Sequence, residues 1–475
     1  KYKTGEKENI EVAEEMESAV LDQINIAKIE STGIEYPSLR KTINAITDTD
    51  TITILQNFEI PQTENSIVIT SEKNITINLN GKKITASNEN TITNEGNLTI
   101  IDNEETIGTI INNYDTLILN KENGNLNINN GTLEMQVSSG KKLINNQGNM
   151  TINGGSINAN AESAVAIYNS GELIVNDGSV NAVYYRGTRS IENAGKTTIK
   201  GGIINSKEYD WETAMIYNYN ELYIDGGKIT ADRIGIYNAR KDNLIGKLEM
   251  TGGEITTGGY GIQNSANIKL IDGTITSSNR AIYNENQETN TEINGGSITA
   301  EREAVYNTNW SYNGSLTITG GKIISNQCSA VFNACSNDKK TVIKVTGGEI
   351  ESKNTKYCTT DPRYTSGIYS EGYGEVILGE NDEGVPSKES PKITGTNYGV
   401  YTATVNNKFY FYDGIITGKA GQSIYGKVTE IPTDYTIQKY KTGEKENIEV
   451  AEEMESSILE NTNVVRVESS KNTYI

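Results

Sequence analysis

Apolar and polar residues alternate along most of the chain in a short phrase that returns many times. The phrase reads L/M/I-x-I/V/M-x-x-G-x-I/V, as in Met150 to Ile157 and Leu222 to Ile229. A two-residue period of this kind is typical of a β-strand with one buried face. Its glycine stands where a side chain would obstruct a positive φ or a close backbone approach. The pattern predicts short strands separated by tight turns, with no helix inside the repeat.

A second phrase, Ile or Val followed by any residue and then asparagine, occurs once in each period. Its asparagines lie 20 to 26 residues apart, a loose period that marks repeat architectures. If three strands fill each period, every strand pairs with its equivalents in the neighbouring coils, and the asparagines stack about 4.8 Å apart. We therefore predict a hydrogen-bonded Asn ladder formed by Asn146, Asn169, Asn193, Asn218, Asn238, Asn264, Asn284, Asn307 and Asn333.

The G-x-L-x-I-x-G-G-x-I phrase followed by A/G-I-Y-N resembles the coils of right-handed parallel β-helix (pectate-lyase-like) domains in large repetitive bacterial surface proteins and adhesins. The resemblance covers roughly residues 45 to 425. It implies an all-β fold, a right-handed parallel β-helix (β-solenoid) with three short strands per coil, and an extracellular location on a bacterial cell surface. A β-propeller is disfavoured, because its blades need longer antiparallel strands and a longer repeat.

Short capping or linker segments are expected at both ends of the β-helix. We divide the chain into a linker and N-terminal cap, the parallel β-helix, and a linker with the start of a next tandem unit, at residues 1–46, 47–428 and 429–475. A short helix that begins near Pro37 is expected to cover the open end of the first coil, which otherwise presents unpaired strand edges.

Residues 1–18 return without change at 439–456, and the similarity continues from Ile26–Ser31 to Val464–Ser469. Identity over eighteen residues is far stricter than the similarity between coils, so it indicates recent duplication of a whole unit. We expect the chain to be a window from a tandem array. The units of that array are either joined covalently or assembled end to end by self-association into a filament.

The position between the Ile or Val and the asparagine is expected to point outward, and it is usually aromatic. Tyrosines outnumber phenylalanines 27 to 4 in the chain, which suits rings that keep a hydroxyl in water. One interpretation is an aromatic stack that stabilises the coils. The other is an exposed stripe that binds glycan rings or a partner on a host or cell surface. The predicted stripe consists of Tyr168, Tyr217, Tyr237, Tyr283, Tyr306, Phe332, Tyr369 and Tyr401.

Charge and composition narrow the classes of partner and chemistry. The chain has 42 basic and 62 acidic residues, a formal charge of −20, which disfavours nucleic acid and anionic lipid as partners. It contains no histidine, the commonest general base and metal ligand. No apolar run approaches the roughly 20 residues of a membrane span. We predict no cofactor, no metal site and no membrane span in this window.

The carboxylates of the regular coils do not form the close pairs that glycosidases need. We expect Asp177, Asp225 and Asp272 to shape turns. An acidic site is conceivable only in the irregular segment 351–395, although a solvated loop is the preferred interpretation of that segment. The candidate acidic residues in it are Asp361, Glu371, Glu375, Glu380, Asp382 and Glu383.

The three cysteines are Cys328, Cys335 and Cys358, without a Cys-x-x-Cys spacing, which argues against zinc or a redox pair. Two interpretations remain open. Either a disulfide between Cys335 and Cys358 staples the insertion that contains Cys358, or the thiols are free and buried.

Together these observations predict a non-enzymatic extracellular structural or adhesive repeat protein that forms a rigid rod or fibre on a bacterial surface. Two alternatives stay open: a polysaccharide lyase or glycoside hydrolase of the β-helix type, and a glycan-binding module that uses the tyrosine stripe.

Overall fold

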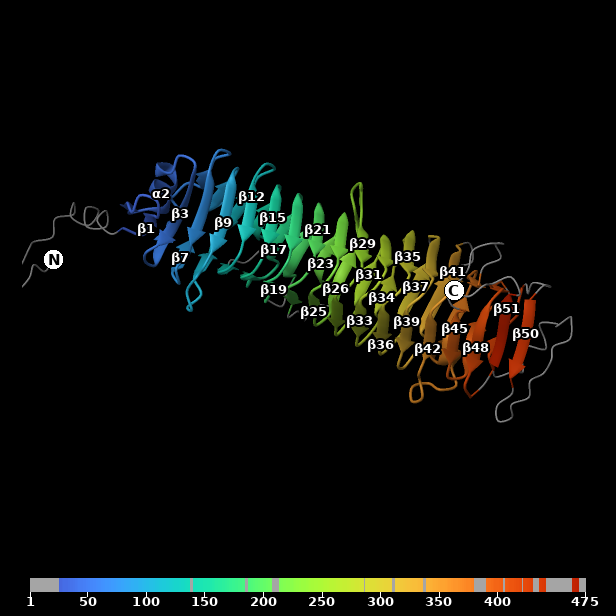
Figure 1. The fold of residues 1–475 in the computed structure, drawn as a ribbon. Helices are drawn as coiled ribbons and strands as arrows, with labels where there is room; N and C mark the ends of the chain where they lie inside the picture. Colours follow the sequence, from blue (N-terminus) through green and yellow to red (C-terminus); the bar gives the residue numbers. More distant parts are fainter. Residues whose placement is uncertain are drawn as a thin grey trace, which may run out of the picture.

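In a computed structural model the chain forms an elongated parallel β-solenoid of about 14 turns (Figure 1). Only 3% of the residues are helical, and three parallel sheets run along the rod, which confirms the predicted fold class. The structure describes residues 25–136, 140–183, 187–206, 213–285, 287–309, 312–335, 339–379, 390–404, 406–420, 422–429, 435–440 and 464–469.

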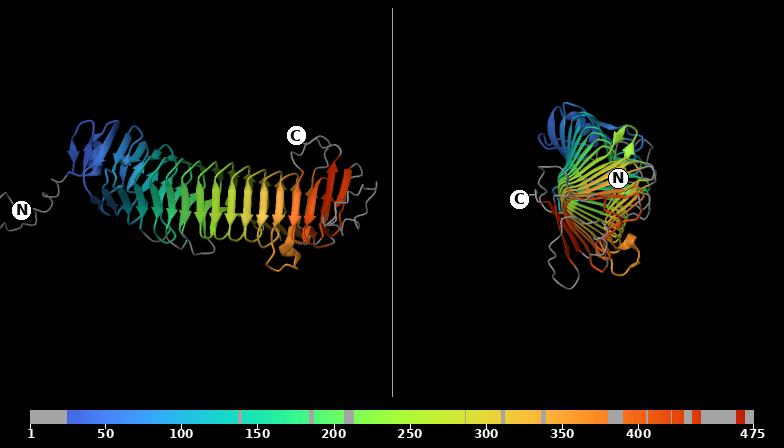
Figure 2. Two further views of the ribbon diagram at one scale, coloured as in Figure 1. Left: turned by 60° about the horizontal axis from the view of Figure 1, so that its bottom comes forward. Right: turned by 90° about the vertical axis from the view of Figure 1, so that its right-hand side faces the viewer.

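Each turn contributes one strand to each sheet, and the strands stack along the axis of the rod (Figure 2). The first sheet contains β3 (Thr49–Ile54), β6 (Asn74–Asn78), β9 (Asn97–Ile101), β12 (Asn125–Ile128), β15 (Asn149–Ile152), β18 (Glu172–Val175), β21 (Lys196–Ile199), β24 (Glu221–Ile224), β29 (Lys247–Met250), β32 (Asn267–Leu270), β35 (Thr289–Ile293), β38 (Gly314–Ile318), β41 (Thr341–Val345), β44 (Glu375–Leu378) and β47 (Lys408–Phe411). The second sheet contains β4 (Phe58–Ile60), β7 (Lys83–Ala86), β10 (Thr109–Asn112), β13 (Thr132–Met135), β16 (Ser156–Ala159), β19 (Ser179–Ala182), β22 (Ile203–Ser206), β25 (Lys228–Ala231), β30 (Glu254–Thr257), β33 (Thr274–Ser277), β36 (Ser297–Ala300), β39 (Lys322–Ser325), β42 (Glu349–Ser352), β45 (Lys392–Gly395) and β48 (Gly414–Gly418). The third sheet contains β5 (Ile67–Ile69), β8 (Ile92–Asn94), β11 (Ile118–Asn120), β14 (Lys142–Asn146), β17 (Val165–Asn169), β20 (Arg189–Asn193), β23 (Ala214–Asn218), β26 (Ile234–Asn238), β31 (Ile262–Asn264), β34 (Ile282–Asn284), β37 (Val305–Asn309), β40 (Val331–Cys335), β43 (Ser366–Glu371), β46 (Tyr398–Thr402) and β49 (Ile424–Tyr425).

The alternating phrase sets which side chains enter the core. In β24 the side chains of Leu222 and Ile224 are fully buried, whereas those of Glu221 and Tyr223, which alternate with them, reach the surface. In the next turn Leu222 lies opposite Leu248 and Ile224 opposite Met250. Equivalent apolar residues therefore stack on one another from turn to turn, and the interior of the rod is one continuous hydrophobic core.

Glycine is required where the first sheet turns into the second. Gly227 adopts a φ of +76°, and a Cβ at this position would lie 2.7 Å from the carbonyl oxygen of Gly201 in the turn before. Both the left-handed backbone and the close approach exclude a side chain there. The tight turns predicted from the sequence therefore also set how closely successive coils stack.

The N-terminal end of the solenoid is closed by a short helix and two strands. Helix α2 (Leu39–Ala45) lies where the sequence predicts it, with the Ser38 side chain accepting a hydrogen bond from the backbone N–H of Lys41. Strand β1 (Ala27–Ile29) pairs antiparallel with β3 on one side and with β2 (Glu35–Tyr36) on the other. The edge of the first sheet is thereby covered.

At the other end, β51 (Val464–Ser469) pairs antiparallel with β48 and with β50 (Tyr435–Tyr440). Residues 1–18, and all but the first two residues of the identical stretch 439–456, lie outside the described residues. Two further elements lie outside the three long sheets. They are the hairpin of β27 (Arg240–Lys241) and β28 (Leu244–Ile245), and the short helix α3 (Pro362–Thr365).

Candidate binding surface

A ladder of buried asparagines runs along the corner between the third and first sheets. Each side-chain amide donates to the side-chain carbonyl of the asparagine one turn further on, over 2.6 to 3.0 Å. The predicted Asn ladder is confirmed from Asn146 to Asn307. It also includes Asn94 and Asn120, whose Ile-x-Asn phrases follow the same pattern.

The last predicted member, Asn333, lies in register with Asn307 but outside the chain of hydrogen bonds. Its amide donates instead to Cys335 Sγ at 3.3 Å and to Ser370 Oγ at 3.2 Å. In the described part of the chain, Asn307 Nδ2 and Asn333 Oδ1 are buried without a hydrogen-bond partner. The ladder ends here because the next turn offers a serine in place of an asparagine.

The predicted aromatic stripe lies on the outer side of the third sheet, next to the ladder. From Tyr283 onward the rings form a column, with centroids 5.7 Å apart for Tyr283 and Tyr306 and 4.8 Å for Tyr306 and Phe332. The column continues through Tyr369 and Tyr401, at 5.0 and 5.5 Å, and ends on Tyr425, which was not among the predicted members.

The stripe is less exposed than the sequence predicts. Phe332 and Tyr369 are 7% and 5% exposed. The other predicted members, Tyr168, Tyr217, Tyr237, Tyr283, Tyr306 and Tyr401, are half-buried. Stacking on neighbouring rings removes much of each ring face from water. Around Phe332 and Tyr369 the stripe therefore fits the interpretation as an aromatic stack that stabilises the coils.

Burial also changes the ionisation of the tyrosines. It raises the pKa of Tyr237 to about 12, and the nearby Glu285 carboxylate, which accepts a hydrogen bond from the Tyr237 hydroxyl at 3.1 Å, acts in the same direction. Burial likewise raises the pKa of Tyr219 and of Tyr401 to about 12. These hydroxyls stay protonated well above neutral pH.

Cationic side chains lie over several rings of the stripe, which the sequence pattern does not predict. Lys142 Nζ is 3.2 Å from the centroid of the Tyr168 ring, and Arg189 Cζ is 4.1 Å from that of Tyr217. Further along, Arg280 Cζ is 3.6 Å from the centroid of Tyr306. Such contacts are typical of cation–π pairs.

Two buried carboxylates lie beside these cations. Glu192 occupies the stripe position between Tyr168 and Tyr217 and accepts hydrogen bonds from Arg189 at 2.6 Å and from Lys241 at 3.2 Å. Glu303 accepts from Arg280 Nε at 2.8 Å. In both cases the arginine that covers a ring also neutralises a carboxylate.

The acidic residues expected to shape turns do so at two positions. The backbone N–H groups of Gly178 and Gly273 donate to the carboxylates of Asp177 and Asp272 at 2.8 and 2.7 Å. Asp225 instead accepts from the hydroxyl of Thr251 at 2.8 Å.

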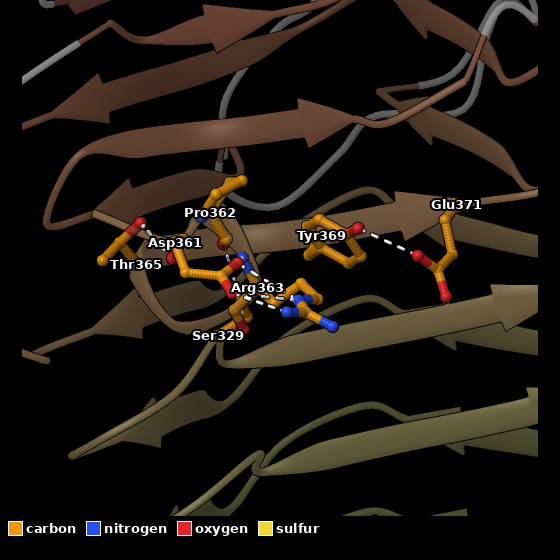
Figure 3. A network of polar contacts seen from close by, with 7 residues as sticks. All are labelled: Ser329, Asp361, Pro362, Arg363, Thr365, Tyr369 and Glu371. Atoms are coloured by element: carbon orange, nitrogen blue, oxygen red, sulfur yellow. Dashed lines mark hydrogen bonds and ion pairs between the residues drawn. The ribbon is translucent and has the colours of Figure 1, made fainter. Parts of the chain in front are cut away.

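In the irregular segment, each of the three candidate carboxylates that the structure describes has a structural partner of its own. Asp361 caps α3 and pairs with Arg363 at 2.7 Å, whereas Glu371 accepts from the Tyr369 hydroxyl at 2.9 Å (Figure 3). Glu375 pairs with Lys340 at 2.6 Å. Glu380, Asp382 and Glu383 lie outside the described residues.

Among the residues that the structure describes, no group of three or more Cys, Asp or Glu side chains could hold a metal ion. In the same residues, no helix has the length and apolar character that a membrane span requires.

The disulfide between Cys335 and Cys358 is not formed. All three thiols are free, with Cys328 and Cys335 buried and Cys358 exposed. The thiol of Cys335 is enclosed beside the end of the Asn ladder, whereas Cys358 lies in the surface segment before α3. The interpretation as free buried thiols therefore holds for two of the three cysteines.

Comparison of the chain with protein-family models, with curated proteins and with solved structures found no match. The fold and its ladders define a parallel β-solenoid.

Proposed function

We propose that the chain is a rigid structural or adhesive rod, one unit of an extracellular repeat protein on a bacterial surface. The observation that carries this proposal is the unbroken stacking of the three sheets through about 14 turns. At about 4.8 Å per turn the rod is roughly 65 Å long. The Asn ladder joins ten of these turns by buried hydrogen bonds, which disfavours bending between them.

The two ends of the solenoid support end-to-end joining of units. Ile26–Ser31 and Val464–Ser469 are related in sequence, and strands from both segments pair antiparallel with a terminal turn, β1 with β3 and β51 with β48. Related segments therefore close opposite ends of the same body. The repeated residues 1–18 and 439–456 adjoin these strands in sequence, as expected for a joint between tandem units.

The cell-surface assignment rests on the resemblance of the coil phrase to pectate-lyase-like β-helix domains of bacterial surface proteins and adhesins. The formal charge of −20 suits an extended rod, because like charges keep neighbouring rods apart in solution.

Electron microscopy of the intact chain tests the proposal. Rods about 65 Å long, single or joined into filaments, are the expected result. A variant without residues 1–18 and 439–456 shows whether the repeated stretches act as the joint, provided that its circular dichroism matches that of the parent. Compact particles from the intact, folded chain would overturn the proposal.

A glycan-binding function is the second candidate, because half-buried tyrosine rings with cations beside them line one side of the rod. Incubation with uronate-containing and neutral polysaccharides separates binding from the third alternative, a lyase or hydrolase. Release of shorter products would establish an enzyme and refute a purely structural role.

A further inference from the structure

Three cationic side chains gather on the stripe between β14 and β26. Lys142 lies over the ring of Tyr168, Arg189 lies over Tyr217, and Lys241 Nζ is 4.6 Å from the centroid of Tyr219. We call these six residues, together with Glu192, the cationic–aromatic patch. It is formed by four adjacent strands of the third sheet (β14, β17, β20 and β23), the segment after β23 and the β27–β28 hairpin.

The hairpin completes the patch from a distant part of the chain. Lys241 belongs to β27 and lies 49 positions after Glu192, yet its ammonium group is 3.2 Å from the Glu192 carboxylate. It therefore reaches back across two turns of the solenoid. The Lys241 side chain is 46% exposed, so its ammonium group remains open to a ligand in solution.

The charges of the patch do not balance. Arg189 and Lys241 share the single carboxylate of Glu192, and in the described part of the chain no carboxylate lies within ion-pair distance of Lys142. Burial lowers the pKa of Lys142, as expected for an ammonium group without a partner. The excess of positive charge stands out on a chain with a formal charge of −20.

Several lysines elsewhere on the rod have carboxylate partners in neighbouring turns. Lys196 pairs with Glu172 at 2.8 Å and Lys228 with Glu254 at 3.2 Å. Lys247 is the closest counterpart of the patch lysines, because it lies 5.1 Å from the centroid of the Tyr223 ring, but Glu221 is within 4.0 Å of it. A cation–π contact alone therefore does not distinguish the patch. Its distinguishing feature, among the described residues, is a cation over a ring, Lys142, that has no carboxylate within ion-pair distance.

We propose that the cationic–aromatic patch binds a glycan that carries a negative charge. The acidic group of the sugar pairs with Lys142 and Lys241 through charge-assisted hydrogen bonds. A face of a sugar ring packs on the exposed part of the Tyr168 or Tyr217 ring. This inference rests on the proposed display of the rod outside the cell and gives its tyrosine stripe a ligand class.

Binding is measured with the full chain against three probes: a sialylated oligosaccharide, a sulfated heparin-derived oligosaccharide and a neutral maltohexaose. We expect at least one acidic probe to bind, with affinity that falls as salt is raised, and maltohexaose not to bind. The carboxylated and sulfated probes then tell which acidic group the patch accepts.

The variants are Lys142→Gln, Lys241→Gln and, as the matched control, Lys247→Gln. Each patch substitution should weaken binding about tenfold, since each removes one charge-assisted contact, and the control should not change it. Failure of both acidic probes to bind overturns the inference, as does an equal loss in Lys247→Gln. The rod proposal is judged separately, by the particle shape in electron micrographs without ligand.

Discussion

The side-chain amide of Asn218 donates a hydrogen bond of 2.8 Å to the side-chain carbonyl of Asn238, one turn further along the rod. The same amide donates to the backbone carbonyl of Lys247 at 3.1 Å, where β29 begins. Both asparagine side chains are fully buried, so water cannot replace these bonds. One amide therefore links two turns and also fixes the corner between the third and first sheets.

Substitution of Asn218 by alanine should be strongly destabilising. It removes the acceptor of the Asn193 amide and the donor to Asn238, which leaves two buried polar groups unpaired. At about 1–3 kcal/mol for each unsatisfied group, we expect the free energy of unfolding to fall by at least about 2 kcal/mol. Urea denaturation followed by circular dichroism measures the change.

A second ladder provides the control for this measurement. Asn153 donates to Asn129 at 2.9 Å and accepts from Asn176 at 2.8 Å, but these side chains are exposed. Water can replace both bonds, so Asn153→Ala should cost no more than about 0.5 kcal/mol. If Asn218→Ala and Asn153→Ala lower the free energy of unfolding equally, burial is not the reason that the inner ladder stabilises the rod.

Substitution of Gly227 by alanine tests the tight turns. The new Cβ would meet the carbonyl oxygen of Gly201 at 2.7 Å in addition to straining a φ of +76°. Gly33 has a similar φ of +69°, but a Cβ added there would have no atom within 4 Å, so Gly33→Ala costs backbone strain alone, about 1–2 kcal/mol. Thermal melts should show a larger loss for Gly227→Ala, and the difference reports the close stacking of turns.

Stability should decline in alkali as the buried tyrosines ionise. Tyr237 has a pKa raised to about 12 by burial, against about 10 in an unfolded chain. The folded state holds this proton more tightly, so the stabilisation is complete below pH 10 and is lost as the pH rises towards 12. Urea midpoints measured across this range should fall less steeply in Tyr237→Phe. The control is Tyr114→Phe, at an exposed tyrosine. It should leave the decline of the urea midpoint with pH unchanged.

The thiols should differ in their reactivity. Cys358 is exposed, whereas Cys328 and Cys335 are buried, and burial raises the pKa of Cys328 to about 12. A thiol reagent at neutral pH should label one cysteine in the native chain and all three after denaturation. Loss of native labelling in Cys358→Ser identifies the site. Rapid labelling of two or three thiols in the native chain contradicts the buried positions.

The fold could be predicted from the sequence because a solenoid repeats its local rule. Ile216 and Asn218 face inward, as do the equivalent residues of the other turns, because the two-residue period of a strand fixes the face on which each side chain lies. The ladder followed from that register. The orientation of the Asn333 amide did not follow from that register, because it depends on Ser370, 37 residues later.

The cationic–aromatic patch could not be predicted in the same way. Lys142, Val165 and Arg189 occupy equivalent positions in three successive strands of the third sheet. The residue type at this position changes from strand to strand, so the repeat does not predict a cation there. Lys241 reaches the patch through an irregular hairpin that interrupts the repeat. Contacts made by insertions do not follow the period, so sequence reasoning found the rings and missed the cations over them.

The ion pair between Arg280 and Glu303 is largely buried beside the stripe, and removing one partner shows how much an unpaired buried charge destabilises the rod. The side chain of Glu303 is only 4% exposed and that of Arg280 only 14%. Arg280→Met removes the 2.8 Å partner of Glu303, and the remaining cation, Arg302, is 3.6 Å away. Because a buried carboxylate is then poorly compensated, we expect a loss of about 3–5 kcal/mol in the free energy of unfolding.

The double variant Arg280→Met with Glu303→Leu separates the pair from its surroundings. Removing both charges relieves the uncompensated carboxylate, so the double variant should be more stable than Arg280→Met alone. Arg280 also covers the Tyr306 ring at 3.6 Å, and the methionine keeps part of that apolar cover. A double variant less stable than Arg280→Met would contradict this expectation. It would mean that Glu303 stabilises the rod mainly through contacts with residues other than Arg280.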